Sequence, residues 1–153
     1  KHLFAGLNPE RICAAAINNG ISRYAIEKGA QYAGERAVWG VPIGSHQGVA
    51  HPLAAAYVGV QQARLMTARA AQLYDLGSPE AGEASNMAKV AAADSSLVAL
   101  DQAIQVHGGN GLAVEYGLAD LWFIARLHKT APVSREMVLN YFAQHSLGLP
   151  KSY

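Results

Sequence analysis

The sequence is poor in charged residues and in cysteine, and each scarcity excludes a class of protein. Lys, Arg, Asp and Glu make up 15% of the chain and leave a formal net charge of +1. The basic residues are scattered, so a surface for nucleic acid is not indicated. Cys13 is the only cysteine, which excludes an intrachain disulfide framework and fits a reducing compartment.

Long apolar runs are missing as well. No stretch approaches about 18 consecutive apolar residues, the minimum for a membrane-spanning helix, and no signal peptide is visible. We therefore expect no contact with a membrane. No alternating strand pattern occurs, and no Glu has a His three residues later, as di-iron helical bundles require. The pattern predicts neither a large sheet nor a metal site.

Small and apolar residues dominate what is present. Hydrophobic residues make up 51% of the 153 positions, with 15 glycines and many alanines. A chain of this length has the size of one domain and can bury a core. Because few charged residues are available for the surface, we expect part of that surface to face other protein. The chain begins at Lys1 rather than Met, so we expect a fragment of a longer protein.

The first helix is predicted to start at Asn8-Pro9-Glu10. Asn8 suits the capping position, Pro9 the first helical position, and Glu10 the positive end of the helix dipole. We expect this helix to last to about Tyr32 and to bury one stripe at helical spacing. The stripe consists of Cys13, Ile17, Ile21 and Tyr24, with the cysteine as a small core residue.

Two further long helices are predicted downstream. The second carries Pro52 in its first turn and presents an apolar bundle seam. That seam consists of Val49, Leu53, Ala56, Val60, Ala63 and Ala70. Gly77 is expected just past its end, and Ser78 as the cap of the third helix. The third helix is predicted to end in the segment Gln105–Gly111 and to face inward with Val90, Leu97, Leu100 and Ile104.

Two shorter helices are predicted near the C-terminus, from about Leu118 to Leu127 and from about Ser134 to His145. Pro132 separates them, because the residue before a proline is disfavoured in helical geometry. The small residues on the long helices imply a close approach between helices. Together the patterns predict an all-α fold, an up-down bundle of three long helices plus two short ones.

Two glycine-containing segments carry the strongest functional signal. Gln105–Gly111 has three glycines in four residues, so its backbone can turn sharply and come close to another group. Upstream, Gly34–Ile43 is followed by His46-Gln47. In this order the segments closely resemble the C-terminal helical domain of the acyl-CoA dehydrogenase family, flavoenzymes that desaturate acyl-CoA thioesters. The resemblance runs from about Leu7 to about Tyr141.

This resemblance implies a cofactor, a substrate and partners. The cofactor is FAD, the substrate an acyl-CoA, and the electron acceptor an electron-transferring flavoprotein. The assembly is a homo-oligomer (dimer or tetramer) or a heterotetramer. Residues 1–153 then form a single C-terminal helical domain of a larger flavoenzyme, in the bacterial cytoplasm or the mitochondrial matrix. Acyl chain length and branching do not follow, because other domains supply most pocket walls in relatives.

The resemblance places the catalytic base at Glu10. Desaturation needs a carboxylate that removes the proton next to the thioester. Many family members carry it in a Glu-Gly-Thr segment before the last helix, but Pro132 stands there in this sequence. Isovaleryl-CoA and long-chain acyl-CoA dehydrogenases instead place a glutamate before an arginine at the start of the first helix, and Glu10-Arg11 is similar. The alternative for Glu10 is an ordinary acidic residue in a first helical turn.

Ten residues resemble family positions that hold FAD. Arg36 matches the arginine that reaches the pyrophosphate across a subunit interface, and Gln47 matches a glutamine that contacts the adenine half. The other eight are Val38, Trp39, His46, Gln105, Gly108, Gly109, Ser134 and Glu136. By the same resemblance, Asn8 and Arg11 match positions that contact substrate; the alternative for each is a capping or surface role.

Several alternatives stay open beside these roles. Arg36 is alternatively a solvated cation at a helix end, Trp39 a core aromatic residue, and the glycine-rich segment a tight turn. We interpret His107 and His128 as structural. At the level of function, one alternative is a subunit without a base that serves as an oligomerisation and FAD-contact module, which Pro132 supports. Another is a related flavin oxidase or monooxygenase.

Overall fold

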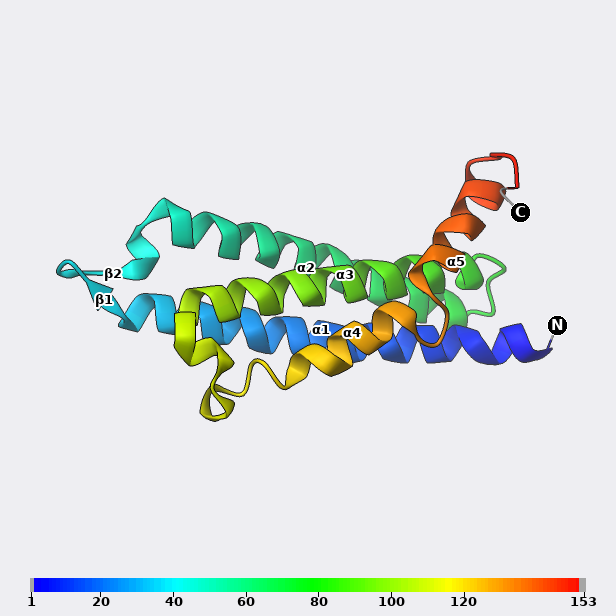
Figure 1. The fold of residues 1–153 in the computed structure, drawn as a ribbon. Helices are drawn as coiled ribbons and strands as arrows, with labels where there is room; N and C mark the ends of the chain where they lie inside the picture. Colours follow the sequence, from blue (N-terminus) through cyan, green and yellow to red (C-terminus); the bar gives the residue numbers. More distant parts are fainter. Residues whose placement is uncertain (1, 152–153) are drawn as a thin grey trace.

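Three long helices form the body of the molecule. A computed structural model describes the backbone of residues 2–151 and the side chains of residues 6–151. α1 (His2–Glu35), α2 (Gln47–Asp75) and α3 (Ala81–His107) run up and down beside one another (Figure 1). The predicted all-α bundle is confirmed.

Shorter elements connect the long helices or follow them. They are β1 (Ala37–Val38), β2 (Val41–Pro42), η1 (Ile43–Ser45), η2 (Gly108–Leu112), η3 (Val114–Tyr116), α4 (Leu121–Thr130), α5 (Arg135–Tyr141) and η4 (Phe142–Ser146). β1 and β2 form a small antiparallel hairpin that the sequence pattern did not predict. α4 lies along α1 and α3, whereas α5 points away from the bundle axis (Figure 1). The last helix therefore does not complete the bundle.

Two predicted helix starts are wrong, and both errors involve proline. α1 already begins at His2, so Pro9 lies inside it, and α2 begins at Gln47, so Pro52 lies beyond its first turn. A proline removes one backbone hydrogen bond and clashes with the preceding turn. Long helices that are packed on their neighbours tolerate this cost.

The predicted helix ends are more accurate. Gly77 lies just past the end of α2, after the C-cap Leu76, and Gly108 directly follows α3. Their φ angles of 63° and 59° favour glycine. Ser78 does not cap α3, which starts at Ala81. Its hydroxyl instead accepts a hydrogen bond from the backbone N–H of Glu80 at 3.2 Å, within the turn between the helices.

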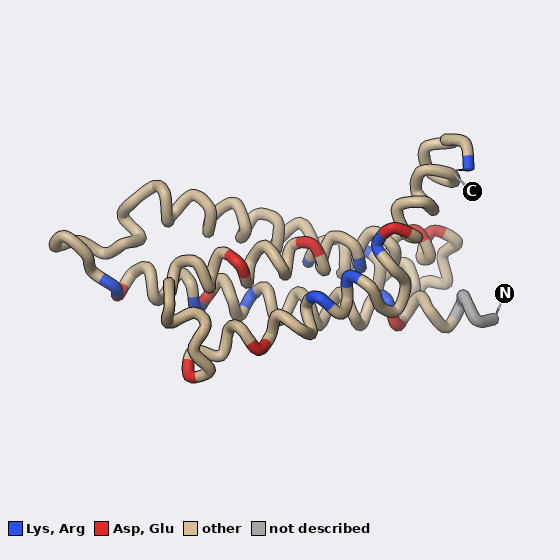
Figure 2. Tube along the Cα trace, viewed as in Figure 1, with Lys and Arg blue, Asp and Glu red and all other residues tan. Residues whose placement is uncertain are grey.

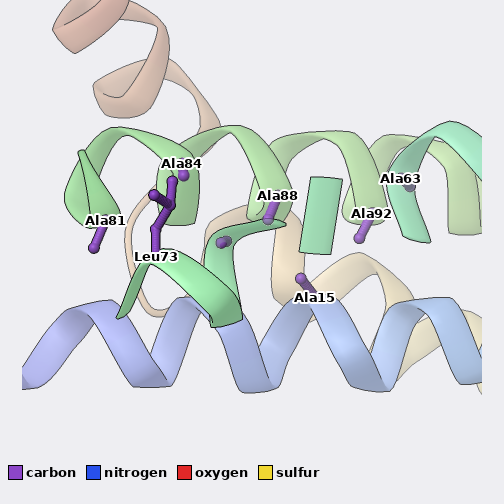
Figure 3. Close-up of a cluster of buried hydrophobic side chains, with 8 residues drawn as sticks. Ala15, Ala63, Leu73, Ala81, Ala84, Ala88 and Ala92 are labelled. Carbon is purple, nitrogen blue, oxygen red and sulfur yellow. The ribbon is translucent and has the colours of Figure 1, made fainter. Parts of the chain in front are cut away.

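The core is built mainly from alanine. One cluster joins the three long helices through Ala15, Ala63, Ala70, Leu73, Ala81, Ala84, Ala88 and Ala92 (Figure 3). A second cluster, nearer the hairpin, contains Leu100, Ala103, Val60 and Ala25. Small side chains let the helix backbones approach closely: a Cβ added at Gly29 would lie 3.1 Å from Leu53 Cδ2 and 3.4 Å from Ala103 Cα.

The predicted core stripe of α1 is wrong except at Ile21. Cys13 is exposed, and Ile17 and Tyr24 are 50% and 37% exposed. The buried face instead carries smaller residues, namely Ala14, Ala15, Asn18, Ser22 and Ala25. On α3 only Leu100 of the predicted inward residues is fully buried, because alanines occupy the remaining core positions. The α2 seam is confirmed at Leu53, Ala56, Val60, Ala63 and Ala70, which are buried, whereas Val49 is only partly buried.

Buried hydrogen bonds fix the register of the helices. Ser96 Oγ on α3 donates to Asn18 Oδ1 on α1 at 3.0 Å. Asn19 Nδ2 on α1 donates to Thr67 Oγ1 on α2 at 2.9 Å. Buried polar groups are costly without a partner, so these pairs favour one alignment of the three helices.

Charged side chains are unevenly distributed over the bundle. No Lys, Arg, Asp or Glu occurs between Arg36 and Arg64, so the hairpin and the first half of α2 are uncharged (Figure 2). Tyr57, Val58 and Leu65 on α2 are nonetheless exposed. Within residues 2–151, no helix is long and apolar enough to cross a membrane.

We predict that Gly111→Ala destabilises the fold while Gly109→Ala does not. A Cβ at Gly111 would lie 2.6 Å from the carbonyl oxygen of Ile104, whereas one at Gly109 meets no atom within 4 Å. Overpacking of this kind typically costs about 1–3 kcal/mol. Thermal unfolding of both variants checks this, and equal midpoints for the two would contradict it.

Candidate functional site

The predicted site residues gather at opposite ends of the bundle (Figure 1). We call the first group the hairpin end; it comprises residues 36–47 and 105–111. The second group, the α5 end, comprises residues 8–11 and 131–136. α3 connects the two ends with 27 residues, a length of about 40 Å at 1.5 Å per residue. None of the predicted site residues lies midway between the two ends.

Trp39 is the most unusual residue of the hairpin end. With Gly40 it forms the turn of the hairpin, at φ of 53° and 83° respectively. A bulky residue at positive φ is uncommon and marks strain. The indole is 89% exposed, and its one aromatic neighbour among the described side chains is His46, with ring centroids 6.1 Å apart. It is therefore not a core aromatic residue, and packing within the chain does not account for it.

The glycine-rich segment lies beside the end of α1. Tyr32 on α1 stacks on His107 with ring centroids 4.2 Å apart, and its hydroxyl accepts a hydrogen bond from Asn110 Nδ2 at 3.2 Å. These contacts place Gly108 and Gly109 near the hairpin, both of them exposed and with no atom closer than 4 Å to an added Cβ. The space above them is open to another molecule.

Positive potential accompanies this open surface. Arg36 is exposed and forms no ion pair among the described residues. His46 is the N-cap of α2, and the first turn of α2, which Gln47 opens, contains no acidic residue. A long helix presents partial positive charge and free N–H groups at its N-terminus, which suits phosphate. The hairpin end therefore fits a phosphate-containing ligand with a flat ring.

The α5 end contains a cavity of about 540 Å³ between α1, α3 and α5. Asn8 and Arg11 line it from α1, and Asn86 lines it from α3. Tyr141 and His145 close the α5 side. The cavity thus brings together the two residues predicted to contact substrate, with amide, phenol and imidazole groups around them.

Arg11 is an uncommon buried cation. Its side chain is only 6% exposed, it donates one hydrogen bond to Asn8 Oδ1, and its Nε has no partner. Burial lowers the pKa of the guanidinium, an effect that Tyr141 opposes. Asn86 Oδ1 on the same cavity wall also lacks a partner. Buried polar atoms are usually satisfied, so these two atoms are available to a ligand.

Glu10 stands apart from the cavity. It follows Pro9 inside α1, and its side chain is exposed rather than among the residues that line the cavity. Because α1 begins at His2, Glu10 lies beyond the first turn of this helix. The helix dipole therefore has little effect on Glu10. The structure brings Glu10 close to Arg11 along the chain but directs it to the outer surface of this domain.

The last short helix, α5, begins where the sequence predicted. Ser134 is the N-cap of α5, and its Oγ accepts a hydrogen bond from the N–H of Met137 at 3.3 Å. Glu136 lies in the first turn and is exposed. Pro132 is half-buried in the preceding loop, and Ala131 is extended at φ −101° and ψ 155°. The expected break before the proline is confirmed.

Lys89 is a buried residue that the sequence analysis missed. It is 0% exposed on α3, and its Nζ donates hydrogen bonds to the carbonyl oxygens of Val133 at 2.5 Å and Lys129 at 3.2 Å. Burial lowers its pKa to about 8, although Asp94 and Glu136 raise it. Its acceptors lie 40 and 44 positions away along the chain. The one sequence signal was a lysine within an alanine-rich helix face.

Asp94 reinforces the same contact from α3. Its carboxylate accepts hydrogen bonds from Arg135 Nε at 2.8 and 3.1 Å and pairs with Lys129 Nζ at 3.1 Å. All three side chains are about one-third exposed. Lys89 and Asp94, one basic and one acidic side chain of α3, thus bind both ends of the segment that joins α4 to α5.

The histidines at the two ends have structural surroundings. His107 is buried, and its Nδ1 lies 2.7 Å from the carbonyl oxygen of Ala103. Burial, together with the positive charge of Lys89, lowers the pKa of His128. Among the described residues, no cluster of three or more His, Cys, Asp or Glu side chains is arranged to hold a metal ion.

Comparison with known sequences identifies close relatives. The chain is 58% identical over 153 residues to acyl-CoA dehydrogenase fadE12 of Mycobacterium bovis, covering 99% of this chain and 39% of that protein. It is 37% identical over 127 residues to the probable acyl-CoA dehydrogenase YngJ of Bacillus subtilis, covering 83% of this chain and 33% of that protein. The chain thus spans about two-fifths or less of these curated relatives.

Solved structures share the fold. A glutaryl-coenzyme A dehydrogenase matches with a TM-score of 0.91 and 29% identity over 98% of this chain and 38% of that one. The butyryl-CoA dehydrogenase of Megasphaera elsdenii matches with a TM-score of 0.90 and 26% identity over 94% of this chain and 37% of that one. Residues 3–147 match the family model for the acyl-CoA dehydrogenase C-terminal domain. The chain therefore belongs to the acyl-CoA dehydrogenase family and corresponds to its C-terminal domain.

Proposed function

We propose that this chain is the C-terminal domain of an FAD-dependent acyl-CoA dehydrogenase that desaturates an acyl-CoA thioester. The observation that carries the proposal is the hairpin end. There an exposed indole at positive φ, the unpaired Arg36 and the uncharged N-terminus of α2 lie together. No contact among the described residues accounts for this arrangement, whereas a dinucleotide offers a partner for each part.

At the hairpin end, the chain's own groups would hold the phosphate and adenosine part of FAD. Arg36 supplies a fixed positive charge for the pyrophosphate, and Gln47 an amide for the adenine half. Trp39 offers a flat apolar face, with Val38 and His46 beside it. Gln105, Gly108 and Gly109 would form a second border of this site, where the two glycines, having no side chains, allow close approach of the cofactor.

At the α5 end, Ser134 and Glu136 would contact a second FAD molecule. The two ends lie at opposite ends of a long helix, so one cofactor is assigned to each end. Each complete site then takes its hairpin end from one subunit and its α5 end from another. The exposed apolar residues of α2 support such an assembly, since an uncharged surface favours contact with protein. The proposed assembly is a homo-oligomer or a heterotetramer.

The substrate would lie against the α5 end. Asn8 and Arg11 line the cavity there, and the unpaired Nε of Arg11 is a hydrogen-bond donor for the acyl-CoA. Glu10 acts as the general base that takes the proton from the carbon next to the thioester. Bound FAD supplies the acceptor for the hydride from the neighbouring carbon. Because Glu10 is exposed in this chain, the remaining domains of the enzyme would exclude water from it.

A second candidate is a subunit that has no base and only completes the cofactor site of a partner. Pro132 favours it, because the position that holds a glutamate in many relatives carries no titratable group.

An electron-transferring flavoprotein is the proposed electron acceptor of the active enzyme. Rapid reoxidation of the substrate-reduced flavin by oxygen would indicate an oxidase instead.

We predict that Glu10→Gln in the full-length enzyme nearly abolishes flavin reduction by acyl-CoA in a single turnover. A positioned general base contributes typically about 10²–10⁴-fold in rate. Substrate should still bind and perturb the flavin spectrum. The matched control is Glu27→Gln, on the same helix and exposed, which should reduce at the parental rate. Parental reduction by Glu10→Gln would move the base to another residue.

We predict that Arg36→Gln weakens FAD retention by the assembled enzyme. A charge-assisted hydrogen bond to phosphate contributes about 1.5–3 kcal/mol, so the dissociation constant should rise about 10- to 100-fold. Flavin released during gel filtration measures the effect. Arg23→Gln provides the control, because this exposed arginine on α1 pairs only with Glu27 in the described residues. Equal retention in both variants would contradict the assignment.

A further inference from the structure

The strongest unassigned feature is the buried ammonium group of Lys89. Fully buried lysines are rare because their charge loses hydration, and they are usually paired. Lys89 forms no ion pair among the described residues and instead donates to two backbone carbonyl oxygens, those of Val133 and Lys129. The carbonyl of Val133 belongs to the loop that leads into α5, and the carbonyl of Lys129 to the last turn of α4 before that loop. The two hydrogen bonds of the buried ammonium group hold this loop against α3.

The loop is fixed at two points. Lys89 holds residues 129–133 from inside the molecule, and Asp94 holds Lys129 and Arg135 from the surface. Ser134 lies between these attachments and caps α5. The direction of α5, which leaves the bundle axis, therefore depends on these contacts with α3 (Figure 1).

We propose that Lys89 is a positioning residue for the flavin site: its ammonium group fixes residues 129–133 and thereby places Ser134 and Glu136 at the start of α5. The proposal rests on the proposed function, since those two side chains are the ones assigned to FAD at this end. Lys89 does not itself touch the cofactor.

Both the charge and the donor number of Lys89 matter for this role. An ammonium group has three N–H donors, and two of them bind partly buried carbonyls. Removing it takes this donor away from both partly buried acceptors, which favours movement of the loop. The neutral amine above pH about 8 donates more weakly. The charged and titratable groups around it are Arg11, Asp94, His128, Lys129, Arg135 and Glu136.

Hydrogen exchange in the full-length protein tests the positioning role without any turnover. In Lys89→Met, the amides of residues 133–141 should exchange at least about tenfold faster, while those of α2 keep the parental rate. Lys129→Met is the matched control, because it loses an ion pair to Asp94 but keeps its carbonyl acceptor. Because Lys89 and the Arg135–Asp94 pair remain, the exchange of α5 should rise much less than in Lys89→Met. No change in Lys89→Met, or faster exchange throughout the chain, would overturn the proposal. Lys89→Gln, which retains donors, should restore part of the protection.

Kinetics of the FAD-loaded enzyme provide the second test. Misplacement of a site by about 1 Å costs on the order of 100-fold in rate. Lys89→Met should therefore reduce its flavin about 10- to 100-fold more slowly, with KM for acyl-CoA changed less than about threefold. The ratio of parental to Lys89→Met rates should fall as the pH rises through about 8. A rate in Lys89→Met equal to that of Lys129→Met would overturn the role. If the parental enzyme shows no acyl-CoA-dependent reduction, the proposed function fails, and hydrogen exchange still decides the positioning.

Discussion

Close packing of three helices through small side chains determines where every candidate residue stands. Alanine, glycine and serine occupy most contacts of α1 and α2 with α3, so the helix backbones lie near one another. Such contacts contribute little apolar area per residue but tolerate little displacement. The buried pairs Ser96–Asn18 and Asn19–Thr67 add a fixed register. The ends of the bundle are therefore rigid supports, and its functional groups project from those ends.

This architecture separates recognition from chemistry. The hairpin end offers exposed aromatic and basic groups on a strained turn, whereas the α5 end offers a cavity with buried polar atoms. A single copy of the chain presents half of each proposed site. In the proposed enzyme, assembly would be part of the mechanism, because it would join one subunit's hairpin end to another's α5 end. The uncharged first half of α2 is suited to such a contact.

Sequence patterns predicted the all-α fold, the glycine stops at Gly77 and Gly108, and the α2 seam, because these depend on local backbone preference and on period. They failed where packing overrides local signals. Pro9 and Pro52 indicated helix starts, yet the long helices continue through both. The larger apolar residues of α1 indicated its core face, yet close packing selected alanines. Lys89 escaped notice because its partners are backbone carbonyls, which a sequence does not distinguish.

The most direct test of the account is complementation between two differently altered subunits, assayed without added FAD. Full-length Arg36→Gln and Glu10→Gln proteins are each expected to be impaired in one step, FAD retention in the first and proton removal in the second. In a mixed C2 dimer, one of the two sites receives both intact ends and the other receives both altered ends, so about half of the parental activity per mixed dimer should return. Coexpression with two different affinity tags isolates that species. Recovery of acyl-CoA-dependent flavin reduction is the predicted result, and a mixed dimer as inactive as its parents would contradict a site shared between subunits.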